Sequence, residues 1–161
     1  MSLIVDPMVA LLSLQQAINN GDPTVNPHDI GKDYVLIYDE PDGKKRFGYA
    51  KVVSGDVQTL AMFVLTEPID GVTCFNVGYA VKESHRGRGL AIEAVNKGIK
   101  ELKKGLGRNS LRSFYVEAVI DETNAHSIKV AEKLFSSPGV GVKDHYTGTP
   151  ALHFKRLISI R

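Results

Sequence analysis

One short segment rich in glycine and arginine carries the clearest chemical signal of the sequence. It reads Arg86-Gly87-Arg88-Gly89-Leu90-Ala91. Glycine adopts backbone angles that are closed to other residues and lets a ligand come close to the main chain. If a helix begins here, its first N–H groups have no partner inside the helix and lie at the positive end of its dipole. With two guanidinium groups beside them, these N–H groups predict a site for a phosphate-bearing ligand.

The elements that must position this segment can be read on both sides of it. Residues 74–81 are rich in strand formers, and from 89 to 104 apolar residues recur at helical spacing. The segment is therefore a turn between a strand and a helix, which Gly105 and Gly107 are expected to end. Three earlier strands with short turns, at residues 34–38, 46–53 and 57–65, predict an antiparallel meander.

The rest of the chain predicts one mixed α/β domain over residues 1–161. Proline at position 7 and an apolar stripe predict a first helix, and a later helix between strands permits one parallel crossover. The expected further elements are a helix at 7–19, a loop at 21–32, a fifth strand at 111–120, a helix at 125–135, and a closing hairpin at 140–146 and 151–157.

Size and composition exclude several classes of protein. The 161 residues are 43% hydrophobic, which is ordinary for a globular domain, and a net charge of +2 is too mild for a nucleic-acid binder. The single cysteine, Cys74, allows no intrachain disulfide and fits a reducing compartment. We expect no signal peptide and no membrane span, because Asp6-Pro7 interrupts the first apolar residues and no apolar run is long enough. These features favour a cytoplasmic protein.

Two motifs and the order of the elements resemble the GNAT superfamily of acyl-CoA-dependent N-acyltransferases. The first motif is the glycine segment at its strand-to-helix junction, and the second is Asn124-Ala125-His126-Ser127 at the start of the later helix. Residues 89–95 are similar to the branch that acetylates the N-termini of ribosomal proteins. The resemblance covers residues 34–157. It implies a twisted, mostly antiparallel sheet of about seven strands, flanked by helices, with one parallel pair around the CoA site.

The resemblance implies acetyl-CoA as co-substrate and no metal. The pantetheine arm would pair with the strand backbone before the turn, where a free N–H near Val81 could polarise the thioester oxygen. Asn124 would bind the arm, and Lys129 or Lys133 would meet the CoA phosphates. The predicted CoA-binding residues are Ala80, Val81, Arg86, Gly87, Arg88, Gly89, Leu90, Ala91, Asn124, Ser127 and Lys133.

The catalytic half of the family pattern is not kept. Many relatives carry a tyrosine seven residues after the asparagine, where this chain has Ala131. Others carry a glutamate base near Phe75. We therefore expect Glu117, on the fifth strand, to take the proton of the amine, with a pKa raised by burial. Tyr146 is the candidate acid for the departing thiolate, and His85 and His145 are weaker candidates.

Each candidate also has an ordinary structural interpretation. The two arginines can be solvated charges beside a turn, and Asn124 and Ser127 can cap a helix. Glu117 can be a charge on the strand face, and Tyr146 can pack in the hairpin. Cys74 is more typical of a small buried apolar group than of a nucleophile.

The functional expectation is acetyl transfer from acetyl-CoA to a primary amine by direct attack in a ternary complex. The acceptor is a protein N-terminus or a small-molecule amine, and neither nucleic acid nor a membrane is expected as partner. An acyl-CoA-binding module without efficient turnover is the alternative, motivated by Ala131 and Phe75. An exposed sheet edge or the first helix is compatible with a homodimer.

Overall fold

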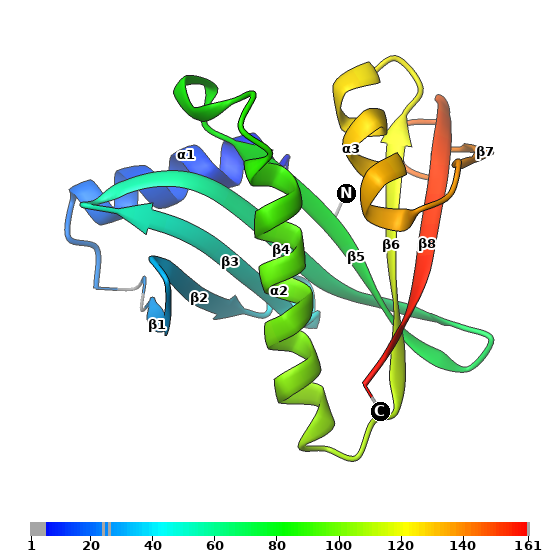
Figure 1. Ribbon diagram of the computed structural model, residues 1–161, viewed down its shortest axis with the longest axis horizontal. Helices are drawn as coiled ribbons and strands as arrows, with labels where there is room; N and C mark the ends of the chain where they lie inside the picture. The colour runs from blue at the N-terminus through cyan, green and yellow to red at the C-terminus, as the bar shows by residue number, and fades with distance from the viewer. Residues whose placement is uncertain (1–5, 24, 26, 161) are drawn as a thin grey trace.

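The computed structural model describes residues 6–23, 25 and 27–160. Its elements follow one another as α1 (Pro7–Asn19), β1 (His28–Gly31), β2 (Tyr34–Asp39), β3 (Arg46–Val53), β4 (Asp56–Ile69), β5 (Val72–Val81), α2 (Leu90–Gly107), β6 (Ser113–Asp121), α3 (Ala125–Phe135), β7 (Val140–Lys143) and β8 (Pro150–Ser159) (Figure 1). Short 3-10 turns occur at Pro41–Gly43 and Glu83–His85.

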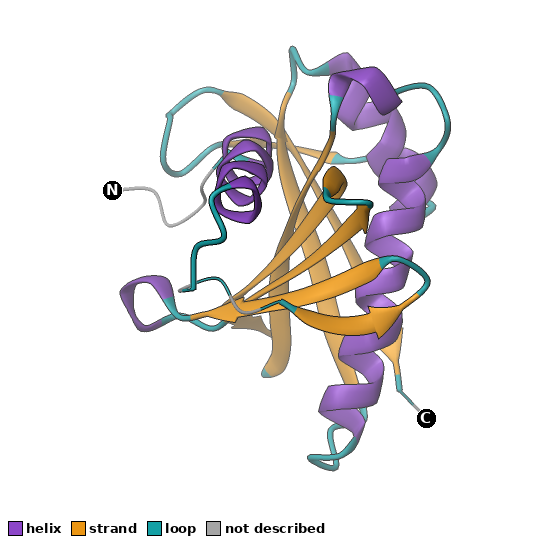
Figure 2. Ribbon diagram, turned by 90° about the vertical axis from the view of Figure 1, so that its left-hand side faces the viewer, coloured by secondary structure: helices purple, strands orange, loops and turns teal. Residues whose placement is uncertain are grey.

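One sheet runs through the molecule in the order β1-β2-β3-β4-β5-β6-β8-β7. Every neighbouring pair is antiparallel except β5 and β6, which are parallel as the helical crossover predicted. Helix α1 lies on one side of the sheet, and α2 lies on the other (Figure 2). The mixed α/β fold is confirmed.

The sheet has eight strands rather than about seven, because the segment predicted as a loop contains β1. Lys32 and Asp33 both have positive φ, at 55° and 67°. Two such residues in succession form the turn that matches the twist of a hairpin, so His28–Gly31 pairs with the start of β2.

The first helix forms as its sequence indicates. The Asp6 carboxylate caps α1 by accepting hydrogen bonds from the N–H groups of Met8 and Val9, at 2.8 and 3.4 Å. Pro7 occupies the first turn, where no N–H is needed. Leu11 and Leu14 are buried in a cluster with residues of β3, β4 and β5, so α1 covers this part of the sheet.

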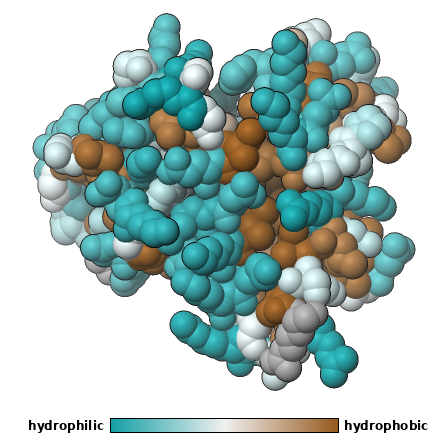
Figure 3. All heavy atoms as spheres, in the orientation of Figure 1, coloured by the Kyte–Doolittle hydropathy of each residue, from teal (hydrophilic) through white to brown (hydrophobic). Residues whose placement is uncertain are grey.

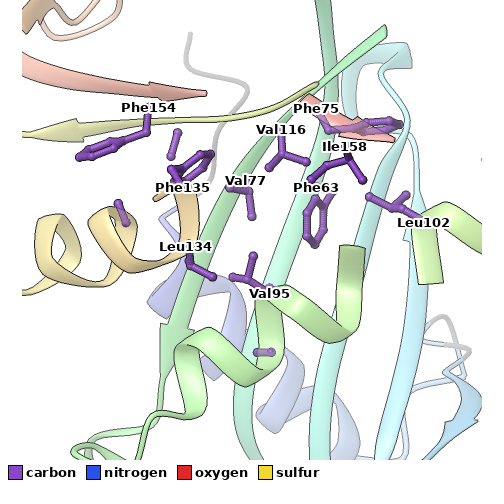
Figure 4. Packing of buried hydrophobic residues seen from close by; sticks show 14 of the residues in the cluster. Phe63, Phe75, Val77, Val95, Leu102, Val116, Leu134, Phe135, Phe154 and Ile158 are labelled. Carbon is purple, nitrogen blue, oxygen red and sulfur yellow. The ribbon is translucent and has the colours of Figure 1, made fainter. Parts of the chain in front are cut away.

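The larger hydrophobic core lies between the sheet and the helices α2 and α3. Phe63 of β4 and Val95 of α2 face one another there, and Phe135 of α3 lies near Phe154 of β8 (Figure 4). Gly98 lets α2 approach the sheet, since a Cβ at this position would lie 2.4 Å from the Phe63 ring. A strip of hydrophobic surface remains visible on this face, between hydrophilic areas (Figure 3).

Several predicted boundaries were wrong. Helix α2 continues through Gly105 to Gly107, because neither glycine takes a positive φ and both stay helical. Strand β4 extends to Ile69, and β7 ends at Lys143 rather than at residue 146. None of the helices in the described ranges combines the length and apolar character that crossing a membrane requires.

Candidate active site

The sheet opens between its two parallel strands. Their pairing consists of Cys74 with Tyr115, Phe75 with Val116, and Asn76 with Glu117. Beyond these pairs, β5 continues along β4 to Val81, while β6 continues along β8 to Asp121. The two strands lie together at one point and diverge towards the level of α3 (Figure 1). Within the part of the chain that the structure describes, the facing edges of residues 77–81 and 118–121 are therefore left without a strand partner.

A cleft of about 510 Å³ occupies this opening and reaches both faces of the sheet. Val77 and Tyr79 belong to the core that α2 and α3 cover, whereas Gly78 faces α1, where a Cβ would lie 2.9 Å from Pro7. The lining residues are Asp6, Pro7, Met8, Asn76, Val77, Gly78, Tyr79, Ala80, Val81, Arg86, Ala91, Val119, Ile120, Asp121, Asn124, His126, Ser127 and Val130.

The glycine segment forms the start of α2. Gly87 and Gly89 have φ values of 80° and 70°, and Gly89 is the N-cap residue. Among the described residues, no side chain caps this helix, so its first N–H groups remain available to an anion. A hollow of about 300 Å³ lies against this end, with Lys129 and Lys133 of α3 in its wall. Because Val81 also lines it, as it lines the cleft, the two spaces are adjacent.

The arginines of the segment also hold the turn in place. The Arg86 Nε donates to the Val81 carbonyl oxygen at 3.4 Å, and an Arg88 nitrogen contacts the His85 Nδ1. On its other side, the His85 Nε2 lies 2.8 Å from the Asp56 carboxylate, which also pairs with Lys82. Hydrogen bonds from Lys82 and, to a smaller extent, from His85 hold the pKa of Asp56 below its usual range. The turn is thus fixed to the start of β4.

A family model described as an acetyltransferase (GNAT) domain matches residues 7–134. The chain belongs to the GNAT acetyltransferase family. A comparison with curated proteins returned no match.

Solved structures share the GNAT fold at low sequence identity. A putative GNAT-family acetyltransferase from Bordetella pertussis is 24% identical, over 71% of this chain and 66% of that one, with a TM-score of 0.51. RimL, a ribosomal alpha-N-protein acetyltransferase, is 18% identical over 70% of each chain, with a TM-score of 0.50. The aminoglycoside acetyltransferase AAC(6')-Ib, solved with coenzyme A and kanamycin, is 15% identical over 69% of this chain and 66% of that one, with a TM-score of 0.53.

The second motif of this GNAT domain closes the cleft from the side of α3. The Asn124 Oδ1 accepts a hydrogen bond from the Ser127 N–H at 3.2 Å, so Asn124 caps α3 while lining the cleft. The hydroxyl of Tyr79 donates to the Ser127 carbonyl oxygen at 2.9 Å. Capping and lining are thus compatible, and the structural interpretation of these residues does not exclude the functional one.

Glu117 lies at the point where β5 and β6 separate. Its carboxylate is 3.6 Å from the His153 Nε2, and Cys74 and Asn76 are its other neighbours. The contact with His153 outweighs burial and holds the pKa of Glu117 below its usual range, so the expected upward shift was wrong. Burial, with the carboxylate beside it, raises the pKa of Cys74 to about 12, which fits an inert buried thiol.

Tyr146 does not reach the cleft. Its side chain is 54% exposed, in the turn after β7, and its N–H donates to the Asp144 Oδ1 at 2.8 Å. Asp144 bends the chain at this point, which is why the strand stops before Tyr146. No observation supports the predicted role of this tyrosine as an acid.

Polar cleft residues that were not predicted as site residues include Asn76, Tyr79, Asp121 and His126. Asn76 and Tyr79 lie in the strand of which only the backbone was expected to bind the pantetheine arm, and His126 lies within the second motif but was given no role. Polar groups among strand formers were the signal that this strand faces a site. The described ranges contain no group of three or more His, Cys, Asp or Glu side chains arranged to hold a metal ion.

Proposed function

We propose that this GNAT domain transfers an acetyl group from acetyl-CoA to a primary amine. One observation carries the proposal: a cleft that passes through the sheet between β5 and β6 and adjoins the uncapped start of α2. A long ligand with a phosphate end and an extended arm fits this combination of features. The family match and the coenzyme A in the neighbouring aminoglycoside acetyltransferase structure support the same donor.

The residues around the cleft suit the parts of acetyl-CoA. The open edge of residues 77–81 offers backbone N–H and C=O groups to the amides of the pantetheine arm, as an added strand would use them. Ala80 and Val81 lie on this edge, and the N–H groups from Gly87 to Ala91 would receive the pyrophosphate. Lys129 and Lys133, in the wall of the same hollow, would add positive charge beside the pyrophosphate.

The amine acceptor would enter from the side of α1, because the phosphates occupy the side of α2 and α3. Asp6 and Asp121 line the cleft, and their carboxylates attract an ammonium group. An amine arriving as a cation must lose a proton before it attacks. A peptide N-terminus and a small polyamine or aminoglycoside both meet these requirements. Of the neighbours, RimL is a ribosomal alpha-N-protein acetyltransferase and AAC(6')-Ib is an aminoglycoside acetyltransferase.

Acyl-CoA binding without efficient turnover is the second candidate. Ala131 is fully buried in the core, so its position supplies no acid to the cleft, and Tyr146 lies outside the cleft. A cytoplasmic location and a homodimer stay predictions for either function.

The test is release of free thiol from acetyl-CoA with three amines: a short peptide with a free N-terminus, spermidine and kanamycin. Calorimetric titration with CoA runs in parallel. Turnover with any amine above the rate of hydrolysis supports the transferase. CoA binding without turnover supports the binding module, and absence of CoA binding contradicts both.

A further inference from the structure

The pair formed by Glu117 and His153 lies beside the end of the cleft that faces α1. In the register of the sheet, Glu117 is opposite Asn76 and His153 is opposite Val119. Both of these partners line the cleft. The pair is therefore one residue away from the space that the reacting groups would share.

The geometry gives the two side chains different roles. The His153 Nε2 faces the Glu117 carboxylate, and the exposed fractions are 27% for His153 and 16% for Glu117. Within the described residues, the other ring nitrogen, Nδ1, makes no hydrogen bond. The contact with the carboxylate orients the ring through its Nε2, which leaves the Nδ1 as the atom that can accept a proton.

The sheet register identifies the ionisable groups around the pair. Strand β7 places Val140, an uncharged residue, opposite His153. The titratable or charged groups on the same face, or lining the cleft beside it, are Tyr115, Glu117 and Asp121 of β6, Lys155 of β8, Cys74 of β5, and Asp6 before α1.

We propose that His153 accepts the proton of the attacking amine, directly or through one water, and that Glu117 is the positioning residue for its ring. The inference rests on the proposed acetyl transfer. The amine nitrogen forms a bond to the acetyl carbon, and the C–S bond breaks with its electron pair going to sulfur. The amine proton passes to the His153 Nδ1 and then, through solvent, to the thiolate.

The neighbours are poorer bases. The pKa of Glu117 is held below its usual range, so its carboxylate has a low affinity for a proton. The thiol of Cys74 stays protonated near neutral pH. A positioned general base contributes about 10² to 10⁴ in rate, which sets the size of the effect to look for.

The experiment compares His153→Gln and Glu117→Gln with the wild type, using the amine of the panel that turns over fastest. His28→Gln is the matched control, because His28 is exposed on β1. We expect His153→Gln to lower kcat/KM for the amine about hundredfold at pH 8, with the Kd of CoA unchanged. The ratio of variant to wild type should rise as the pH falls, because an imidazole that is already protonated cannot act as a base. Acceptor protonation cancels in this ratio.

Glu117→Gln should lower kcat/KM for the amine about tenfold, while kcat/KM still rises with pH, since His153 is present but its ring is no longer held by the carboxylate. A loss of packing alone would leave the ratio flat with pH. Two outcomes overturn this inference alone, provided that the wild type turns over. In the first, the ratio of His153→Gln to wild-type kcat/KM does not change with pH. In the second, His153→Gln reacts at the wild-type rate. Absence of wild-type turnover overturns the proposed function and, with it, the inference. Circular dichroism checks that each variant is folded.

Discussion

The Tyr79 hydroxyl donates a 2.9 Å hydrogen bond to the Ser127 carbonyl oxygen, and this bond joins the two walls of the cleft. Tyr79 belongs to β5 and Ser127 to the first turn of α3. The strands beneath them have already separated, so the bond spans a region where the sheet itself makes no connection.

Replacing Tyr79 with phenylalanine should loosen this connection. We expect the free energy of unfolding to fall by about 1 kcal/mol, the usual net contribution of one hydrogen bond. The Kd of CoA should rise a fewfold, because α3 carries one wall of the binding site. Urea denaturation and calorimetry measure the two effects. Unchanged values for both would show that the bond does not hold α3 in place.

Two glycines of α2 should respond in opposite directions to alanine. At Gly98, the new Cβ would lie 2.4 Å from the Phe63 ring and 2.9 Å from the Tyr49 ring, so Gly98→Ala should destabilise the protein by about 1–3 kcal/mol. A Cβ added at Gly105 would meet no neighbouring atom within 4 Å, and Gly105→Ala should stabilise the helix by about 0.5–1 kcal/mol. Shifts of the same sign in urea denaturation would contradict the packing described for α2.

The lysines beside the start of α2 should contribute to CoA affinity through their charge. The double variant Lys129→Ala/Lys133→Ala should raise the Kd of CoA about tenfold, which corresponds to about 1.4 kcal/mol. The effect should shrink at high ionic strength. Lys104→Ala is the control, because Lys104 is exposed and pairs with Glu101. Equal affinities for the double variant and the control would place the phosphates elsewhere.

Glu117 should make stability depend on pH. Its pKa in the folded protein lies below the ordinary value of 4.5, chiefly through His153. Its carboxylate therefore stabilises the fold above pH 4.5, and this contribution is lost as the pH falls through the folded value. The stability difference between the wild type and Glu117→Gln should shrink from pH 5 to pH 3 in urea denaturation. Glu67→Gln, at an exposed site on β4, is the control. A constant difference would contradict the pairing.

Local signals were sufficient for much of the fold. The helices 7–19 and 125–135 and the strand 46–53 were predicted with their observed bounds, because caps and apolar spacing lie within the segments themselves. Strand β1 was missed because it exists only through its pairing with β2. The direction of the Glu117 pKa was missed for a related reason: His153 lies 36 residues further along the chain, and only the sheet register brings the two together.

The opening of the sheet has a consequence for how the molecule unfolds. Strands β1–β5 and strands β6–β8 are joined in the sheet by three residue pairs, so the two groups can fluctuate as separate cooperative units. A ligand that forms hydrogen bonds with the facing edges of β5 and β6 would couple these units. It would raise the free energy needed to unfold either unit alone. The backbone amides of residues 77–81 would then exchange with solvent more slowly in the complex than in the free protein.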